Sequence, residues 1–282
     1  MSVDAILDVV ESNKHLRKLG IVKNQIGVDH IERLCSAVRD YPLVKLHLSE
    51  SFEPGIGDAM LTSLLTIDDL KLKELDMSEN NITSTASTLL AEFLATNSIL
   101  EILNLHDNNL NDSDAELISN ALRSNSTLTR LYIGNRNITV AGEEAFRSVL
   151  CDISGLNAAS DSNHSCEVYA GSRLNLSSYN SPMGMNMQRN RARKIYALLS
   201  LRNDTTSNVQ HFSDIDLKLL PNILQAMQKY SNYMREYSEV PLSIVYEIMR
   251  KWDKVTPLYV QDIGQVFSKH HVDGVDYICG DL

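Results

Sequence analysis

A leucine-rich phrase recurs along the first half of the chain and constrains the fold more than any other feature. The clearest copy reads Leu72-x-x-Leu75-x-Met77-x-x-Asn80, and the next copy begins at Leu100. The first leucines of the successive copies, 27 to 29 residues apart, are Leu16, Leu43, Leu72, Leu100, Leu128 and Leu156. A fixed period of this length indicates a solenoid, in which each unit buries its apolar face against its neighbours.

Each copy predicts a short strand followed by a helix. Side chains alternate along a strand, so a Leu-x-Leu pair such as Leu103 and Leu105 points inward. The apolar residues downstream, for example Ile118, Ala121 and Leu122, have the spacing of one helix face. A strand and a helix in about 28 residues match the leucine-rich-repeat pattern. We therefore expect an α/β solenoid with a curved parallel sheet inside and helices outside.

Asparagine follows several of these strands at an equivalent place, as Asn24, Asn80 and Asn108. A buried amide there can satisfy the backbone groups of the adjacent turn, so we expect the three to form a structural ladder. The second copy has Ser51 at this place and then inserts Phe52-Glu53-Pro54-Gly55, which predicts a small bulge on the rim.

The two ends of the array differ from its middle. Residues Ala5 to His15 have the spacing of the helical half of a repeat whose strand is missing. Upstream repeats outside this chain would account for this, as would a partner that covers the end, and we favour the first explanation. The sixth copy, from Leu156 to His164, is polar and degenerate. We expect it to form a last strand that ends the array, because terminal repeats are atypical.

The repeat period stops near residue 165, and four segments follow from the composition. Residues 1–167 form the solenoid, and residues 168–187, rich in Ser, Asn, Gly and Pro, form a linker. Residues 188–253 carry amphipathic patterns and form a small all-α C-terminal module, and residues 254–282 form a poorly ordered tail. We expect the helical module to pack on the last repeat, with a separate effector module as the alternative.

Charge and cysteine content restrict the class of function. The net charge of −10 disfavours nucleic-acid binding, which relies on clustered Lys and Arg. The four cysteines lie far apart and match no disulfide or zinc pattern, which favours the cytoplasm. No apolar run reaches the roughly 18 residues of a membrane span, so we expect no membrane partner. A nuclear location stays open through Arg189, Arg191, Arg193 and Lys194, although we interpret this cluster as a solvated helix face.

The side chains that flank the inward leucines point outward and form a concave face. Neighbouring strands lie about 4.8 Å apart, so these side chains make one patch of mixed charge. Because solenoids present such a face to partners, we expect a non-catalytic protein–protein interaction module that needs no cofactor. The residues predicted to contact a protein partner are Lys18, Lys45, His47, Glu74, Asp76, Ile102, Asn104, His106, Arg130 and Tyr132. Tyr132 and Arg130 are the strongest candidates, because Tyr and Arg are frequent in binding hot spots.

Catalytic and metal sites find little support. Ser78, His106 and Asp76 fall on adjacent predicted strands, but an open sheet offers neither an oxyanion hole nor a pocket that excludes water. The histidine pair at 270–271 matches none of the zinc spacings. We therefore expect no enzyme activity and no metal.

Residues 1 to about 165 resemble the ribonuclease-inhibitor-like class of leucine-rich repeats, on the phrases from Leu16, Leu72 and Leu100. This class includes ribonuclease inhibitors, sensing domains of nucleotide-binding immune receptors and Ran GTPase-activating proteins. The segments Asn190–Ser200 and Pro241–Arg250 are similar to a tail in large families of uncharacterised algal leucine-rich-repeat proteins. That second resemblance implies no known activity.

The resemblance leaves two alternative functions. A Ran-type activator uses an arginine and an asparagine on the repeat rim, for which Arg136 and Asn137 are the candidates here. The acidic stretch that follows the repeats in that type is replaced in this chain by Ser, Asn and a basic cluster. A sensing fragment of a larger receptor is the other alternative, and it fits a first repeat that lacks its strand.

Overall fold

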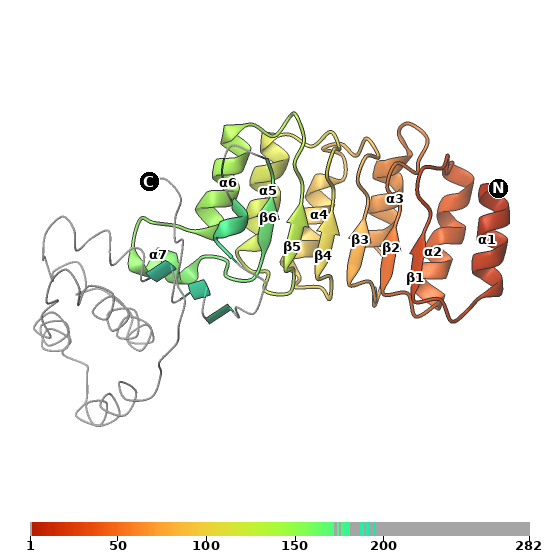
Figure 1. Cartoon of the computed structure of the whole chain (residues 1–282), viewed down its shortest axis with the longest axis horizontal. Helices are drawn as coiled ribbons and strands as arrows, with labels where there is room; N and C mark the ends of the chain where they lie inside the picture. The colour runs from red at the N-terminus through yellow and green to blue at the C-terminus, as the bar shows by residue number, and fades with distance from the viewer. Residues whose placement is uncertain are drawn as a thin grey trace, which may run out of the picture. The chain divides into compact units, whose positions relative to one another are not determined.

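The computed structural model of the chain describes residues 2–171, 174, 176–180, 187–188, 190–191 and 194–195. Within them, short strands form one parallel sheet in chain order (Figure 1). The strands are β1 (Lys18–Gly20), β2 (Lys45–His47), β3 (Glu74–Asp76), β4 (Ile102–Asn104), β5 (Arg130–Tyr132) and β6 (Glu167–Tyr169). This arrangement confirms the predicted α/β architecture with a parallel sheet.

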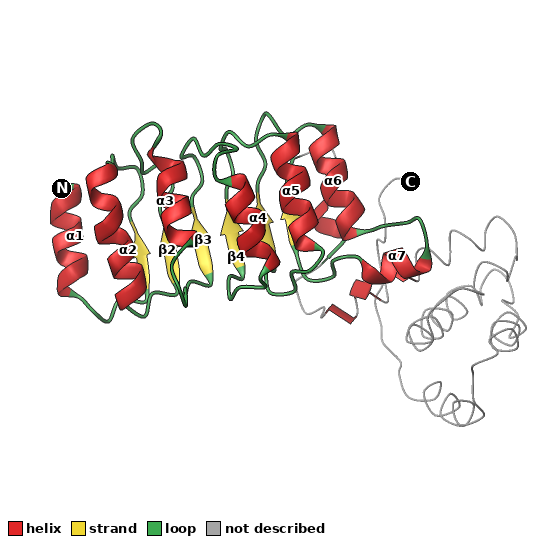
Figure 2. Ribbon diagram, turned by 180° about the vertical axis from the view of Figure 1, so that it is seen from behind, coloured by secondary structure: helices red, strands yellow, loops and turns green. Residues whose placement is uncertain are grey.

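The helices of the solenoid lie behind the sheet, as the reverse view in Figure 2 shows. They are α1 (Val3–Ser12), α2 (Ile31–Asp40), α3 (Ile56–Leu65), α4 (Ser87–Ala95), α5 (Asp112–Leu122) and α6 (Val140–Leu150), with 3-10 turns η1 (Val28–His30) and η2 (Leu176–Ser178). We call a strand with the helix that follows it a coil, so the first coil holds β1 and α2. Strands pack about 4.8 Å apart and helices about 8–10 Å apart, so a stack of such coils is expected to curve with its sheet on the inner side.

The core runs between the two layers. The central leucines of the interior strands, Leu46, Leu75, Leu103 and Leu131, are fully buried. The helices meet them with equally buried side chains, and Phe146 of α6 is the largest of these. Every interior coil thus buries its own leucines against the coils on either side, as a solenoid requires.

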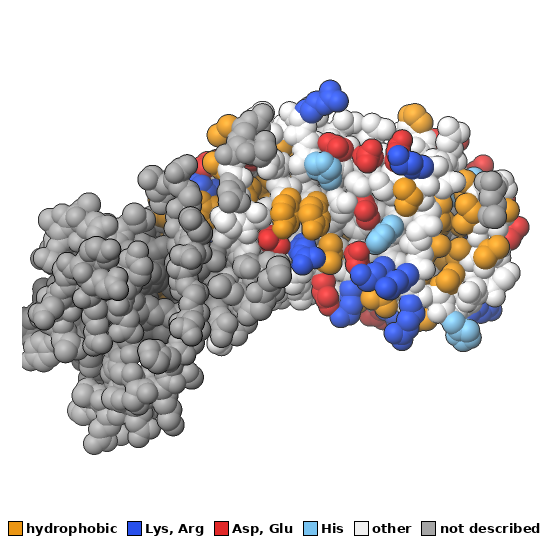
Figure 3. Space-filling model, viewed as in Figure 1, with side chains coloured by type: hydrophobic (Ala, Val, Ile, Leu, Met, Phe, Trp, Pro, Cys, Tyr) orange, Lys and Arg blue, Asp and Glu red, His pale blue; other side chains and the backbone are white. Residues whose placement is uncertain are grey.

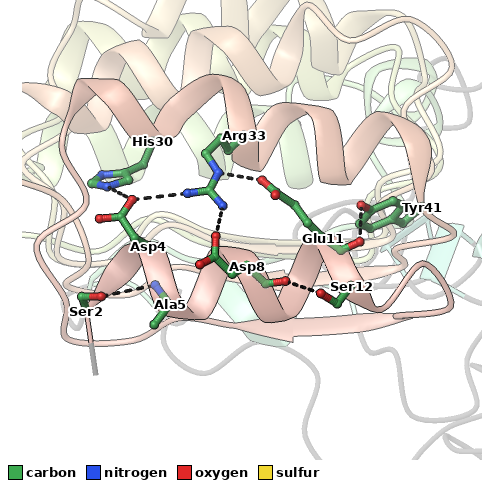
Figure 4. A network of polar contacts seen from close by, with 9 residues as sticks. All are labelled: Ser2, Asp4, Ala5, Asp8, Glu11, Ser12, His30, Arg33 and Tyr41. Carbon is green, nitrogen blue, oxygen red and sulfur yellow. Dashed lines mark hydrogen bonds and ion pairs between the residues drawn. The ribbon is translucent and has the colours of Figure 1, made fainter.

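An ion-pair network joins the first two helices. Arg33 on α2 faces three carboxylates of α1, with Nη2 at 2.7 Å from Asp8 Oδ1, Nε at 2.6 Å from Glu11 Oε1 and Nη1 at 3.3 Å from Asp4 Oδ1 (Figure 4). The hydrogen bonds with Glu11 and Asp8 raise the pKa of Arg33 above its already high value. Positions 4, 8 and 11 share one side of a helix, so the contact fixes which face of α1 meets α2.

The predicted sixth strand is wrong. Residues Leu156–Asp161 form a helix, α7, and the strand lies later, at Glu167–Tyr169. In the sheet, Arg130 of β5 stands opposite Glu167 of β6, 37 residues later in the chain. The equivalent residues of β4 and β5, Ile102 and Arg130, are 28 residues apart. The extra residues hold α7, which belongs with residues 151–162 to a second compact unit.

The asparagine ladder is confirmed in the interior. Asn80 Oδ1 accepts from the backbone N–H of Ser51 at 2.8 Å, and its Nδ2 donates to the C=O of Leu48 at 2.7 Å. Asn108 repeats the pattern one coil later, with Oδ1 accepting from the N–H of Asn80 at 3.0 Å and of Ile82 at 2.9 Å. Each amide thus ties its own coil to the one before it.

Asn24 does not belong to this ladder, contrary to the prediction. Its Nδ2 donates only locally, to the C=O of Val22 at 2.8 Å, because no coil precedes it within the described residues. Ser51 does take part, with Oγ in contact with the C=O of Ile21 and 2.8 Å from the C=O of Ser49. The predicted bulge follows, and Gly55 ends it at φ 85°, a backbone conformation that glycine adopts without strain.

A second asparagine ladder, which the sequence analysis missed, lies at the other end of the strands. Asn125 Nδ2 donates to the C=O of Leu94 at 2.6 Å, and Asn163 Nδ2 donates to the C=O of Leu122 at 2.7 Å. Their Oδ1 atoms accept from residues three positions later, at 2.8 Å from Leu128 N and 2.8 Å from Cys166 N. In the sequence, this second ladder is indicated by an asparagine three residues before the first apolar residue of a copy, as Asn125 precedes Leu128.

A left-handed residue follows the strand in four successive coils. Lys23, Glu50, Glu79 and Asp107 have φ of 56°, 49°, 58° and 52°. Non-glycine residues are uncommon in this region, and each costs about 1 kcal/mol or more in backbone strain. The same turn therefore recurs at the first coil and in the interior.

Most of the C-terminal predictions lie outside the described residues. These are the all-α module beyond residue 195, the tail at 254–282, the histidines at 270–271 and nearly all of the segments that resemble algal proteins. Of the basic cluster, Lys194 is buried and Arg191 is half-buried, with Nε donating to Ser160 Oγ at 2.8 Å. These two side chains do not form the solvated face that the sequence suggested.

Candidate functional site: the sheet face

The outward positions of the strands form a surface that we call the sheet face. Register places Lys18, Lys45, Glu74, Ile102, Arg130 and Glu167 in one row across the sheet. The next row is Gly20, His47, Asp76, Asn104, Tyr132 and Tyr169. Nine of the ten predicted contact residues lie in these two rows, and His106 follows β4 two residues after Asn104. Figure 3 shows this side of the molecule, with Lys, Arg, Asp, Glu and His side chains interspersed over the sheet.

A charged cluster occupies β2 and β3. Glu74 contacts Lys45 through Oε2, and its Oε1 lies 2.9 Å from His47 Nε2. Burial raises the pKa of Glu74, but the hydrogen bonds from Lys45 and His47 outweigh it and hold that pKa below its ordinary value. The carboxylate is therefore charged at neutral pH, and its position is fixed by two neighbours from the adjacent strand.

An aromatic pair occupies β5 and β6. The rings of Tyr132 and Tyr169 stack with their centroids 4.6 Å apart and their planes 10° apart. Tyr169 is 37% exposed, so the pair is open to solvent on one side. Burial and the carboxylate of Glu167 raise the pKa of Tyr169 to about 12, which keeps its hydroxyl protonated at physiological pH. Glu167 also pairs with Arg130 across the strands, at 3.7 Å from Nε.

Tyr169 and Glu167 are not among the predicted contact residues, because the repeat pattern placed the last strand too early. Their signal was Cys166-x-Val168-x-Ala170, in which the apolar residues alternate but none is a leucine. All three of these side chains are buried.

Gly134 follows β5 and permits close backbone packing beside the tyrosine pair. A Cβ at this position would lie 3.0 Å from the C=O oxygen of Ala170 and 3.3 Å from His106 Nδ1. Any side chain would therefore push β6 or His106 away. The glycine lets β6 approach β5 closely enough for the two tyrosines to stack.

Ser78, His106 and Asp76 do not form a catalytic triad. Ser78 Oγ lies 2.7 Å from Asp76 Oδ1 in its own turn and 2.9 Å from Ser49 Oγ in the turn of the preceding coil. His106 Nε2 instead lies 3.2 Å from Asp107 Oδ2 on the exposed rim. A nucleophile needs a base within hydrogen-bond reach, and none of the hydrogen bonds in the described part of the chain joins Ser78 to His106.

The described residues show neither a metal-binding cluster nor a membrane-spanning helix. They contain no group of three or more His, Cys, Asp or Glu side chains arranged to hold a metal ion. None of their helices is both long and apolar enough to cross a membrane.

A comparison with family models supports the repeat architecture at one coil. Residues 69–86, which span β3 and the turn after it, match a family model described as "Leucine Rich repeat". Among curated proteins no match is found. Among solved structures, the chain is similar to one titled "Leiomodin-1 Actin-Binding Site 2 (ABS2)", with 16% sequence identity and a TM-score of 0.37, over 73% of this chain and 99% of that chain. The coil that contains β3 is thus similar in sequence to a leucine-rich repeat.

Proposed function

We propose that the protein is a non-catalytic interaction module that binds a protein partner through the sheet face. The observation that carries this proposal is the stacked pair Tyr132–Tyr169, which is partly open to solvent beside the Arg130–Glu167 ion pair. Tyrosine and arginine dominate binding hot spots because they combine a large apolar area with hydrogen-bonding groups. Stacking holds both rings in place before a partner arrives, so less side-chain entropy is lost on binding.

The charged half of the face supplies orientation. Glu74, Lys45 and His47 are already hydrogen-bonded to one another, so their charges are presented in a fixed pattern. Fixed charges select a partner by complementarity and steer its approach more than they add affinity. We infer that the aromatic half anchors the partner and that the charged half sets its register.

Affinity capture with a matched pair of variants tests the proposal. The sheet-face variant is Tyr132→Ala/Tyr169→Ala, and the control is Leu117→Ala/Val140→Ala, which removes two exposed side chains from the helix layer. We expect a partner that wild type and control retain and that the sheet-face variant binds about tenfold more weakly or worse, because hot-spot truncations cost about 2 kcal/mol or more. If wild type and both variants capture the same proteins equally well, the sheet face is not the binding surface.

A GTPase-activating function of the Ran type is the second candidate. Arg136 lies on the rim after β5, is exposed, and forms no ion pair within the part of the chain that the structure describes. Asn137, beside it, is also exposed. A free rim arginine could stabilise charge in a phosphoryl-transfer site. A Ran hydrolysis assay decides between the two candidates: wild type faster than Arg136→Ala supports the activator, and an unchanged rate with excess protein removes it.

A further inference from the structure

Asp76 is the one strand carboxylate on the sheet face that forms no ion pair within the described residues. The other two, Glu74 and Glu167, each pair with a cation of a neighbouring strand. Asp76 is half-buried, and its Oδ1 accepts from Ser78 N at 3.0 Å and from Ser78 Oγ at 2.7 Å. None of the hydrogen bonds in the described part of the chain involves its Oδ2. Because a half-buried carboxylate is stabilised by a nearby cation, Asp76 has room for one more partner.

The histidines nearest to Asp76 are held by other carboxylates. His47 stands opposite Asp76 in register, but its Nε2 lies 2.9 Å from Glu74 Oε1. His106, which follows β4, has its Nε2 3.2 Å from Asp107 Oδ2. The negative charge of Asp76 is therefore left for a cation from outside the described residues.

The ring of Tyr132 has one face left for a ligand. The centroids of Tyr132 and Tyr169 lie 4.6 Å apart, with the ring planes at 10°. This separation is close to the roughly 4.8 Å between neighbouring strands, so the rings stack in the direction that runs across the strands. Tyr169 on β6 covers one face of Tyr132, and the other face is turned to β4 and to β3 beyond it. The face of an aromatic ring carries partial negative charge and attracts cations.

Asn104 of β4 separates the carboxylate from the ring. Register places Asp76, Asn104 and Tyr132 in one row, with about 10 Å between the Cα atoms of Asp76 and Tyr132. Asn104 Oδ1 accepts from the N–H of His106 at 3.0 Å, which holds this short side chain toward the end of its strand. A tyrosine extends farther from a sheet than an asparagine, so the ring stands above Asn104. Ile102, half-buried, precedes Asn104 on the same face.

We propose that the row Asp76–Asn104–Tyr132 binds a lysine side chain of the partner protein. The ammonium donates to Asp76 Oδ2 and rests against the free face of Tyr132, and the methylenes lie along Ile102. An ammonium has donors in several directions, so it makes both contacts at once. A guanidinium stacked flat on the ring directs its N–H groups within its own plane, away from Asp76. This proposal rests on the proposed function, because it names the chemistry of the partner at the same sheet face.

Short peptides of the form Gly-Leu-X-Leu-Gly test the proposal, with lysine, arginine or norleucine as X. Their ends are acetylated and amidated, so the side chain of X carries the only charge. Binding to the full chain is followed by NMR titration, which reports both the affinity and the signal of the Asn104 side-chain amide. We expect the lysine peptide to bind with a dissociation constant of about 1 mM and to shift that signal. The arginine peptide should bind more weakly, and the norleucine peptide about tenfold more weakly.

Substitutions in the row locate the lysine. Asp76→Asn removes the charge but keeps an oxygen that can accept from Ser78, so the turn is retained. It should weaken binding of the lysine peptide about tenfold and leave the norleucine peptide unchanged. The control Asp107→Asn removes the same charge from the exposed rim and should change the affinity by less than about twofold. Asn104→Lys places an ammonium in the row itself and should abolish binding of the lysine peptide.

Three results would overturn the proposal. They are equal binding of the lysine and norleucine peptides, unchanged binding of the lysine peptide by Asp76→Asn, and an arginine peptide that binds as tightly as the lysine peptide. Each of them leaves the sheet-face proposal standing if Tyr132→Ala/Tyr169→Ala still loses a captured partner. Conversely, equal capture by wild type and both capture variants, together with a lysine peptide that requires Asp76, would remove the proposed function and keep the lysine site.

Discussion

The first and third coils carry the same phrase in different surroundings. In the third coil Leu72 and Leu75 are fully buried, and Asn80 bridges to the coil before it. In the first coil Leu16 is half-buried and Asn24 bonds only within its own turn. The difference teaches that the phrase specifies a local shape, whereas burial and cross-coil bonding come from the neighbours. Four paired changes test this comparison.

The largest effect is expected for the central leucine. Leu75→Ala should lower the free energy of unfolding by about 3–5 kcal/mol, because it leaves a cavity in a fully buried site. Leu19→Ala should lower it by about 1 kcal/mol, because its side chain is already partly in water. Urea denaturation followed by circular dichroism measures both. Equal losses of unfolding free energy in the two variants would mean that Leu19 is as well covered as Leu75 in solution. The two coils would then not differ in burial.

The ladder asparagines come next. Asn80→Ala should cost about 2–3 kcal/mol, because it leaves the buried N–H of Ser51 and the C=O of Leu48 without a partner. Asn24→Ala should change the unfolding free energy by less than about 0.5 kcal/mol, since its amide is accessible to water. The same denaturation experiment checks both variants. A large loss for Asn24→Ala would show that Asn24 has a bridging partner in solution.

The ion pairs of Glu74 in the third coil should make the stability of the protein depend on pH. The folded-state pKa of Glu74 is held below its ordinary 4.5, so its contribution to stability is present above pH 4.5 and is lost as pH falls through the lower folded-state value. We expect Glu74→Gln to be about 1 kcal/mol less stable than wild type at pH 7 and equal to it in strong acid.

Two lysines provide the matched control for Glu74. Lys45→Ala removes a partner of Glu74 and should reduce the pH-dependent difference, whereas Lys18→Ala, one coil earlier, should leave it unchanged. Thermal melts across pH 2 to 7 measure the effect. A difference between Glu74→Gln and wild type that persisted in strong acid would rule out the ion-pair explanation.

The smallest change in stability is expected for the left-handed turns. Here substitutions in the first and third coils should have the same effect. Lys23 and Glu79 have φ of 56° and 58°, so Lys23→Asn and Glu79→Asn should each stabilise the chain by about 0.5 kcal/mol. Thermal melts of the two variants give the values. A gain for Glu79→Asn alone would indicate that the turn of the first coil is not held in solution.

The fold was predictable wherever leucines carry the pattern. Leu72, Leu75 and their equivalents set the strands, and the register follows because each repeat has nearly the same length. Strand β6 was not predictable in the same way. Helix α7 lengthens the preceding connection, and Val168 fills the position that Leu131 occupies in the strand before it.

The candidate site was predictable in part. Period-two alternation places Lys45, Glu74 and Tyr132 on the sheet face, but it contains no information on which side chains pair. The stack of Tyr132 on Tyr169 depends on β6, and Lys18 has no carboxylate opposite it because register places Lys45 there. Both are properties of neighbours that a single repeat does not encode.

The ladders also determine how the chain should respond to mechanical force. Each ladder amide reaches only the adjacent coil, as Asn108 reaches Asn80 and Asn80 reaches Ser51. Among the described residues, no such bond reaches across several coils to resist extension of the whole array at once. A solenoid held at its two ends should therefore lengthen in steps. Each lost coil of about 28 residues should release roughly 95 Å of chain, at about 3.4 Å per residue.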